Sequence, residues 1–268
     1  MKNYINTEEL KQIQIDILQH VDDFCKKNCI KYSICGGTLI GAVRHGGFIP
    51  WDDDIDIMML REDYNRFLSL YTENDSTYYK VFAPEITPDY HYPYAKVDDS
   101  RTVMQEEVCD SIPMGVNIDL FPIDIAPKER KEQLSLVRRN KMWIDILTFK
   151  RLPIISRRGI MKNIALFLAH CLLYFVSTNL IIKKIVHNAQ KYNGNRTGFR
   201  GVLVWGYGMK EVMKEEIFLN TEYMDFGCTK VSAISQWDLY LKSLYGDFMT
   251  LPPEEKRVSH HHFKAYWK

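Results

Sequence analysis

The chain has 268 residues, of which 46% are hydrophobic and 26% charged, as in ordinary globular proteins. This length allows one large domain or a core domain with an insertion, and a formal net charge of +1 gives no support for nucleic acid as a partner. Six scattered cysteines without a CxxC pair, and an N-terminus without an apolar signal segment, favour a reduced, cytoplasmic protein.

The first predicted element is a helix that begins near Thr7. Thr7 is a good N-cap, and two glutamates follow it in the first turn. Apolar residues then recur at helical spacing as far as Phe24. A strand over 31–35 follows this helix.

Two glycines, Gly36 and Gly37, separate that strand from a short predicted helix near 38–44. The N–H groups at a helix N-terminus have no partner within the helix and bind anions well. Glycine also lets a phosphate group approach the backbone closely. We therefore expect Gly36, Gly37 and the Thr38 hydroxyl to bind phosphate.

Four aspartates then fall within five positions, at 52, 53, 54 and 56. Like charges that are buried together raise one another's pKa, so a buried run of this kind requires a cation. Because side chains alternate along a strand, a strand over 54–59 would present Asp52, Asp54 and Asp56 on one face and Asp53 on the other. Such carboxylates suit Mg²⁺, with Mn²⁺ as the alternative. A solvated acidic turn is the other interpretation, but the flanking residues 48–51 and 57–59 are apolar and favour burial.

Alternating helices and strands continue to about residue 126. A helix is predicted over 61–71, and strands over 78–83, 95–97, 102–105 and 116–121. The last strand lies between Gly115 and Pro122, and it carries Asp119 among its polar positions. Asp124 is expected to serve as a cap or turn residue, with a role as a further site carboxylate as the alternative. The pattern predicts a mixed α/β (α+β) fold.

The segment from 128 to 188 is helical in pattern and contains the apolar run 164–182, which four polar residues interrupt. Basic residues flank the run: Lys150, Arg151, Arg157, Arg158, Lys162, Lys183 and Lys184. A membrane-spanning helix, a core or subunit-interface helix, and a helix lying in a membrane interface all remain open. We expect a soluble protein that touches the inner face of the membrane through 160–184.

Several blocks of the sequence resemble the LicD family. They are GGTLIGAVRH at 36–45, GFIPWDDDIDI at 47–57, NIDLFPID at 117–124, VWGYG at 204–208 and YGDFM at 245–249. The resemblance implies a nucleotidyltransferase-like fold, with a mixed sheet flanked by helices. It also implies metal-dependent transfer of a phospho-alcohol. The segment 226–230 departs from the family, which has a Phe-Glu pair and a more regular strand there.

In the best-known members of that family, phosphocholine passes from CDP-choline to a cell-surface glycan such as lipopolysaccharide or teichoic acid. Fukutin-type relatives transfer ribitol phosphate from CDP-ribitol. The resemblance therefore implies a CDP-alcohol donor, a glycan or lipid-linked glycan acceptor, and release of CMP. It suggests three regions: a catalytic core over 1–126, a helical insertion over 127–200, and a segment over 201–268 that completes the site.

The predicted site combines acidic and basic residues. Asp52, Asp54, Asp56 and Asp119 are the expected metal ligands, and Asp119 is also the candidate general base for the acceptor hydroxyl. Arg44 is expected to clamp a phosphate, with a salt bridge to the acidic run as the alternative. Lys96 resembles a family position and is expected to contact the donor.

Choline would require an aromatic cage, and the clustered rings of Tyr90, Tyr92, Tyr94, Trp205 and Tyr207 are the candidates. The histidines at 260–262 are expected in a surface tail. Two other functions stay open at this point. One is a nucleotidyltransferase that moves NMP from NTP to a small acceptor or a protein, and the other is a non-catalytic binding protein with the same fold.

Overall fold

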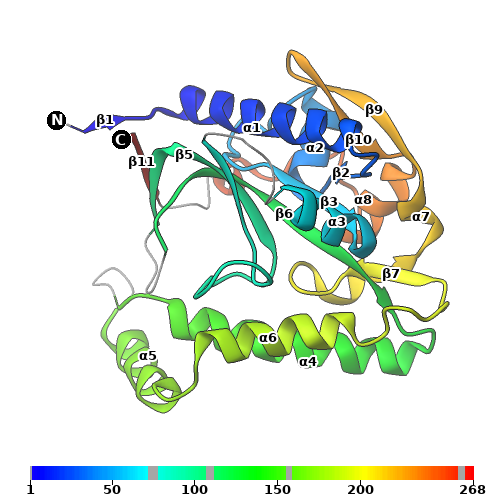
Figure 1. Cartoon of the computed structure of the whole chain (residues 1–268). Coiled ribbons are helices and arrows are strands. Elements are labelled where there is room, and N and C mark those ends of the chain that lie inside the picture. Colours follow the sequence, from blue (N-terminus) through cyan, green and yellow to red (C-terminus); the bar gives the residue numbers. More distant parts are fainter. Residues whose placement is uncertain (1, 72–77, 107–111, 155–158, 259–262) are drawn as a thin grey trace.

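The computed structural model describes residues 2–71, 78–106, 112–154, 159–258 and 263–268, which form one mixed sheet and eight α-helices (Figure 1). The strands are β1 Asn3–Tyr4, β2 Ser33–Ile34, β3 Asp56–Leu60, β4 Tyr79–Phe82, β5 Ala95–Glu106, β6 Met114–Ala126, β7 Phe199–Val202, β8 Met213–Lys214, β9 Thr221–Phe226, β10 Thr229–Ile234 and β11 Phe263–Trp267. The helices are α1 Thr7–Lys27, α2 Gly36–His45, α3 Arg61–Tyr71, α4 Arg130–Arg151, α5 Ile160–Leu173, α6 Thr178–Gln190, α7 Glu216–Leu219 and α8 Trp237–Tyr245, with 3₁₀ turns η2 Gly208–Lys210 and η3 Glu254–Lys256. The predicted fold class is confirmed.

The strand order is β1-β11-β5-β6-β3-β2-β10-β9, and β4 and β7 pair with β5 and β6 respectively. β3 and β6 are parallel, whereas β5 and β6 are antiparallel. β11 brings the end of the chain beside β1, so Asn3 pairs with Trp267 (Figure 1). Residues far apart in sequence therefore share one sheet.

The first helix is confirmed, but its cap is Asn6 rather than Thr7. The Asn6 side chain accepts a hydrogen bond of 2.9 Å from the N–H of Glu9, which satisfies one of the N–H groups at the helix start. Ile17, Leu18 and Val21 of α1 are fully buried. The helix packs across β5, β6 and β10.

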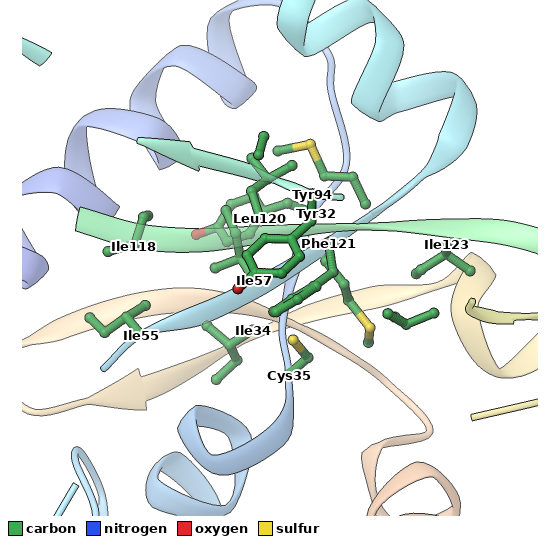
Figure 2. Packing of buried hydrophobic residues seen from close by; sticks show 14 of the residues in the cluster. Tyr32, Ile34, Cys35, Ile55, Ile57, Tyr94, Ile118, Leu120, Phe121 and Ile123 are labelled. Carbon is green, nitrogen blue, oxygen red and sulfur yellow. The ribbon is translucent and has the colours of Figure 1, made fainter. Parts of the chain in front are cut away.

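The centre of the core lies between the middle strands and the helices that cover them (Figure 2). Ile34, Ile57 and Leu120 from three neighbouring strands are fully buried there, as is Ile55. Each such side chain contributes about 1.5–3 kcal/mol through removal from water. This packing fixes the strand ends that carry the acidic residues.

The strand β6 is longer than predicted, since it continues through Pro122 as far as Ala126. On one side, Pro122 pairs with Met59 of β3. On the other side, β6 pairs with β5 up to Leu120 and with β7 from Ile123. Proline is tolerated here because it falls where β6 changes partners and a ladder N–H is not needed. The two strands predicted over 95–97 and 102–105 are likewise one strand, β5, with an irregularity between Asp99 and Met104.

The apolar run 164–182 does not form one helix. The chain breaks between α5 and α6, which lie at 84° to each other. Among the described residues no single helix is long and apolar enough to cross a membrane. The two helices of this bent pair have the necessary length and apolar composition only when taken together. α6 buries Ile181, Ile182 and Ile185 and packs along α4, whereas α5 lies at one end of this pair (Figure 1).

The departure from the family pattern at 226–230 forms a regular antiparallel hairpin of β9 and β10, with Gly227 at φ +62° in its turn. The departure in sequence thus falls at the turn between two paired strands. The positions 157–158 and 260–262 lie outside the described residues. The cysteines that the structure describes are free thiols: Cys25, Cys29, Cys35, Cys171 and Cys228.

Candidate active site

A row of charged residues crosses three neighbouring strands. Asp119 on β6 pairs in register with Lys96 on β5 and with Asp56 on β3. The Lys96 ammonium donates to Asp119 Oδ1 at 2.5 Å and to Asn117 Oδ1 at 3.0 Å. Lys96 is buried, while the Asp119 side chain keeps 20% of its surface exposed. The sheet thus fixes Asp119 between a cation and a second carboxylate.

Asp56 and Asp119 line a cavity of about 400 Å³. Its wall consists of acidic side chains, aromatic rings and a few small or apolar residues. These are Cys35, Gly36, Asp54, Asp56, Tyr94, Asp119, Phe121, Val202, Trp205, Gly206, Tyr207, Glu211 and Tyr240. Four of them carry carboxyl groups, and this described lining contains no Lys, Arg or His.

Carboxylates lie against the two glycines at the start of α2. A Cβ on Gly37 would come within 2.8 Å of Asp52 Oδ2, and one on Gly36 would come within 3.4 Å of Asp56 Oδ2. Gly36 has φ +54°, which other residues adopt only with strain. These glycines therefore make room for the acidic run.

The Thr38 hydroxyl accepts a 2.8 Å hydrogen bond from the N–H of Asp56, and it is buried. This bond joins α2 to the start of β3. A phosphate at this helix N-terminus would meet the carboxylates of Asp52 and Asp56, so it requires a cation between the two charges.

The predicted strand over 54–59 begins only at Asp56. The N–H of Asp52 donates to the carbonyl of Ile49, which places Asp52 in a turn instead. The expectation that Asp52, Asp54 and Asp56 share one strand face is therefore wrong. Asp54 and Asp56 line the cavity, whereas Asp52 lies against Gly37.

The surroundings of Asp56 raise the pKa of its carboxyl group well above the usual range. Desolvation is the main cause, and the neighbouring charges of Asp54, Asp119 and Asp52 add to it, while Lys96 opposes it. The lysine does not compensate for this repulsion. An additional cation would therefore stabilise the ionised form of the cluster.

The acidic residues of the cavity form a small set of possible metal ligands. In the ranges that the structure covers, no three His, Cys, Asp or Glu side chains lie close enough together to hold one. Mg²⁺, however, is commonly bound by one or two carboxylates together with substrate phosphates and water. Asp54 and Asp56 supply such hard oxygen donors in one cavity, so the donor set fits a magnesium ion that arrives with its substrate.

Arg44 does not reach the cavity. It lies near the C-terminal end of α2, where its guanidinium donates to the carbonyls of Phe248 at 2.6 Å and Thr250 at 3.5 Å. No ion pair between Arg44 and the acidic run occurs in the described part of the chain. Arg44 thus attaches the segment after α8 to α2, which neither of its predicted roles included.

Of the five predicted cage residues, Tyr94, Trp205 and Tyr207 line the cavity. Tyr90 and Tyr92 do not; they pack behind Tyr94 in a run of neighbouring rings. Tyr94 lies 5.9 Å from the Trp205 ring, centroid to centroid. The cavity therefore has an aromatic wall, although a smaller part of the tyrosine run forms it than predicted.

Glu211 and Tyr240 line the cavity but were not among the predicted site residues. Glu211 follows the Gly206-Tyr207-Gly208 turn, and burial raises the pKa of its carboxyl group to about 8. Tyr240 lies on α8 and is fully enclosed. The glycine-rich turn was the only signal near Glu211, because a lone glutamate before an apolar pair is typical of any exposed strand end.

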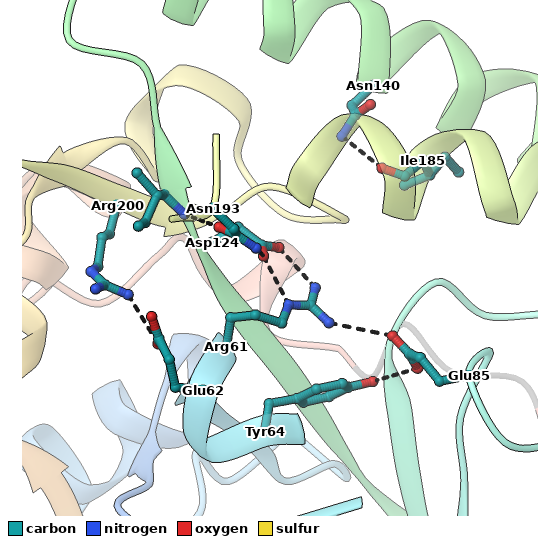
Figure 3. Close-up of polar contacts among 10 residues, drawn as sticks. Arg61, Glu62, Tyr64, Glu85, Asp124, Asn140, Ile185, Asn193 and Arg200 are labelled. Atoms are coloured by element: carbon teal, nitrogen blue, oxygen red, sulfur yellow. Dashed lines mark hydrogen bonds and ion pairs between the residues drawn. The ribbon is translucent and has the colours of Figure 1, made fainter. Parts of the chain in front are cut away.

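Asp124, five residues beyond Asp119 on β6, has an entirely different environment (Figure 3). Arg61 donates to both of its carboxylate oxygens at 2.8 Å, and Asn193 donates to Oδ1 at 2.7 Å. Arg61 also contacts Glu85 at 3.3 Å. Asp124 belongs to a strand and a core ion pair, so the predicted cap or turn role is wrong.

Comparisons with known proteins agree with the motifs. Residues 29–143 match the model of the LicD/FKTN/FKRP nucleotidyltransferase domain. The lipopolysaccharide cholinephosphotransferase LicD of Haemophilus influenzae is 31% identical over 267 residues, which cover 98% of both chains. An uncharacterised protein of Rickettsia typhi is 36% identical over 30% of this chain and 26% of its own. The human ribitol 5-phosphate transferase FKRP is 50% identical over 34 residues, which make up 13% of this chain and 7% of FKRP.

Proposed function

Since this chain belongs to the LicD family, we propose that it transfers phosphocholine from CDP-choline to a hydroxyl group of a cell-surface glycan and releases CMP. A relative named for phosphocholine transfer to lipopolysaccharide matches it over almost its whole length. The observation that carries the proposal is the row of Lys96, Asp119 and Asp56, which opens into an acidic cavity with aromatic walls.

In this proposal Asp54 and Asp56 hold Mg²⁺, with Mn²⁺ as the alternative. When bound, the metal ion neutralises charge on the donor phosphates and acts as a Lewis acid. Asp52, next to Gly37, adds negative charge behind this pair. The residues at the start of α2 then bind a phosphate group whose charge the metal has offset.

Asp119 is the proposed general base. Its carboxylate accepts the proton of the acceptor hydroxyl while the new oxygen–phosphorus bond forms and the bond to CMP breaks. Lys96 acts as a positioning residue, because its ammonium group fixes Asp119 Oδ1 at 2.5 Å. A base held in one orientation lowers the entropy that must be lost before reaction.

The direct test is CMP release. Purified protein with Mg²⁺ would be given CDP-choline, CDP-ribitol, CDP-glycerol and CDP-ethanolamine, each with and without a glycan acceptor. We expect acceptor-dependent CMP from CDP-choline, and loss of that signal when EDTA removes the metal. No CMP from any donor, together with pyrophosphate released from an NTP, would instead establish a nucleotidyltransferase.

We also propose that α5 touches a membrane surface. The spacing of its exposed apolar side chains places most of them on one side of the helix: Ile160, Met161, Ile164, Phe167, Leu168 and Leu172, followed by Tyr174 and Phe175. Leu172 is 82% and Phe175 91% exposed. Contiguous apolar patches of this kind mark interaction sites, and basic residues nearby favour anionic lipid. Lys162, Lys183 and Lys184 are exposed on the same two helices.

Vesicle sedimentation tests this contact. The protein should sediment with vesicles that contain anionic phosphatidylglycerol and bind less to neutral phosphatidylcholine. The double variant Leu172→Ser/Phe175→Ser should lose most of this binding, whereas Met249→Ser/Leu251→Ser, which changes two exposed apolar residues after α8, should keep it. Equal binding by both variants would contradict the proposal.

A further inference from the structure

The wall of the cavity formed by the segment after β7 carries a buried carboxyl group. Glu211 is 3% exposed, and its Oε1 accepts a 3.3 Å hydrogen bond from the N–H of Tyr207. Its Oε2 is buried and has no hydrogen-bond partner among the residues that the structure describes. An unpartnered carboxyl oxygen in such a place is costly unless a ligand satisfies it.

The backbone around Glu211 is shaped to accommodate this side chain. A Cβ on Gly206 would come within 2.6 Å of Glu211 Oε1, and Gly206 has φ +91°. A Cβ on Gly201 would come within 2.4 Å of the Glu211 carbonyl oxygen. Gly206 thus leaves room for the Glu211 side chain and Gly201 for its backbone, so the fold accommodates a buried glutamate at this position.

Charge decides what this pocket can accept. The described lining of the cavity has four carboxyl groups and no basic side chain. Asp119 has Lys96, and Asp54 and Asp56 are the proposed metal ligands, so the fourth group, Glu211, lacks a counter-charge. Burial raises the pKa of Glu211 to about 8, and a bound cation would favour its ionised form.

Aromatic side chains line the same cavity as this carboxyl group. Trp205, Tyr207 and Tyr240 line the cavity beside Glu211, and Tyr207 meets Tyr245 edge to face at 5.1 Å. The faces of such rings attract cations, most strongly quaternary ammonium groups. A polyol would instead need a hydrogen-bond partner for each of its hydroxyl groups, and it would leave an ionised Glu211 without a counter-charge.

We propose that Glu211, together with Trp205, Tyr207 and Tyr240, forms the subsite for the quaternary ammonium head group of the donor. This proposal rests on the proposed function, because it names the part of the cavity that recognises the transferred alcohol. The phosphate end then lies toward Asp54 and Asp56. Glu211 selects the cationic donor and takes no part in proton transfer.

The test compares CDP-choline with the CDP ester of 3,3-dimethylbutanol, in which carbon replaces the quaternary nitrogen. We expect the natural protein to prefer CDP-choline by about 10- to 100-fold in kcat/KM, the range given by a desolvated charge pair with cation–π contacts. Glu211→Gln keeps the shape but removes the charge, and it should reduce this preference to about threefold or less. Its kcat/KM for the neutral donor should change by a smaller factor than its kcat/KM for CDP-choline.

A merely structural role would lower both rates together and leave their ratio unchanged. Glu222→Gln, on the exposed face of β9, is the matched control and should keep the natural preference. Should Glu211→Gln not fold, Trp205→Leu removes a ring face and should also lower the ratio.

The two levels of the proposal fail differently. If the natural protein releases no CMP from either donor, the proposed function itself is wrong. If it uses CDP-choline and Glu211→Gln, or in its place Trp205→Leu, retains the full preference for the charged donor, the subsite is wrong while the transferase function stands.

Discussion

Asp119 and Asp124 lie five residues apart on one strand and show how differently the same side chain can be used. Asp124 is fully buried, and the two nitrogens of Arg61 together with Asn193 saturate it (Figure 3). Asp119 has a single lysine and faces a cavity that holds more acid than base. A closed charge network of the first kind stabilises a fold, whereas an open one of the second kind is prepared for a ligand.

The largest expected effect comes from the open network. Asp56→Asn should lower CMP release by about 10³-fold, because a metal ion contributes several kcal/mol to transition-state stabilisation. Its stability should not fall, since the change removes a charge that its neighbours repel. Steady-state kinetics and thermal unfolding measure the two together, and a folded variant with full activity would contradict the assignment.

In the closed network around Asp124, the same kind of substitution should lower the stability of the protein. Asp124→Asn should lower the free energy of unfolding by about 3–5 kcal/mol, because it leaves the buried Arg61 without its main partner. Urea denaturation measures this loss. Asp145→Asn, in an exposed pair with Lys141, is the matched control and should cost about 0.5 kcal/mol. Equal losses of unfolding free energy in the two variants would contradict the stabilising role assigned to the Asp124 network.

The contribution of Glu211 to the stability of the protein should depend on pH. In the unfolded chain this carboxyl group releases its proton near pH 4.5, whereas in the folded protein its pKa is about 8. Between these values the folded state binds more protons, so this group's contribution to stability falls as pH rises and levels off above pH 8. Glu211→Gln should remove that fall. At pH 8 its free energy of unfolding should exceed that of the natural protein by a few kcal/mol. Parallel stability curves for the two proteins from pH 5 to 8 would refute it.

The smallest effect concerns the link between α2 and the acidic run. Thr38→Val should cost about 1–2 kcal/mol, because the N–H of Asp56 loses its acceptor. Activity should fall far less than in Asp56→Asn. Thr38→Ser retains the hydroxyl and should behave like the natural protein in both denaturation and CMP release.

The local patterns predicted much of this architecture. The motif blocks identified the family, and hydrophobic spacing located α1, α3 and the central strands. The pairing of Asp56 with Asp119 could not be read from one sequence, because long-range packing of β3 against β6 sets it. Arg44 was misassigned for a related reason, since its partners lie more than two hundred residues away.

The site residues divide in the same way. Asp54 and Asp56 form an Asp-x-Asp pattern, Asp119 lies in one of the family's motif blocks, and all three line the cavity. Glu211 has no such pattern, because its environment arises from Gly201, Gly206 and the rings around it. The three interpretations of the apolar run 164–182 all assumed a single helix. The chain instead breaks between α5 and α6, so that α6 packs in the core while most of α5 is exposed.

The pairing of β11 with β5 has a consequence for synthesis on the ribosome. β5 carries Lys96, and its 102–106 part is covered by Phe263–Trp267, roughly 150 residues later in the chain. At about 5–20 residues per second this edge waits roughly 10–30 s for its partner. During that interval it presents unpaired N–H and C=O groups of the kind that recruit other nascent chains. Until that strand emerges, this edge is a place where the growing polypeptide can pair with another chain.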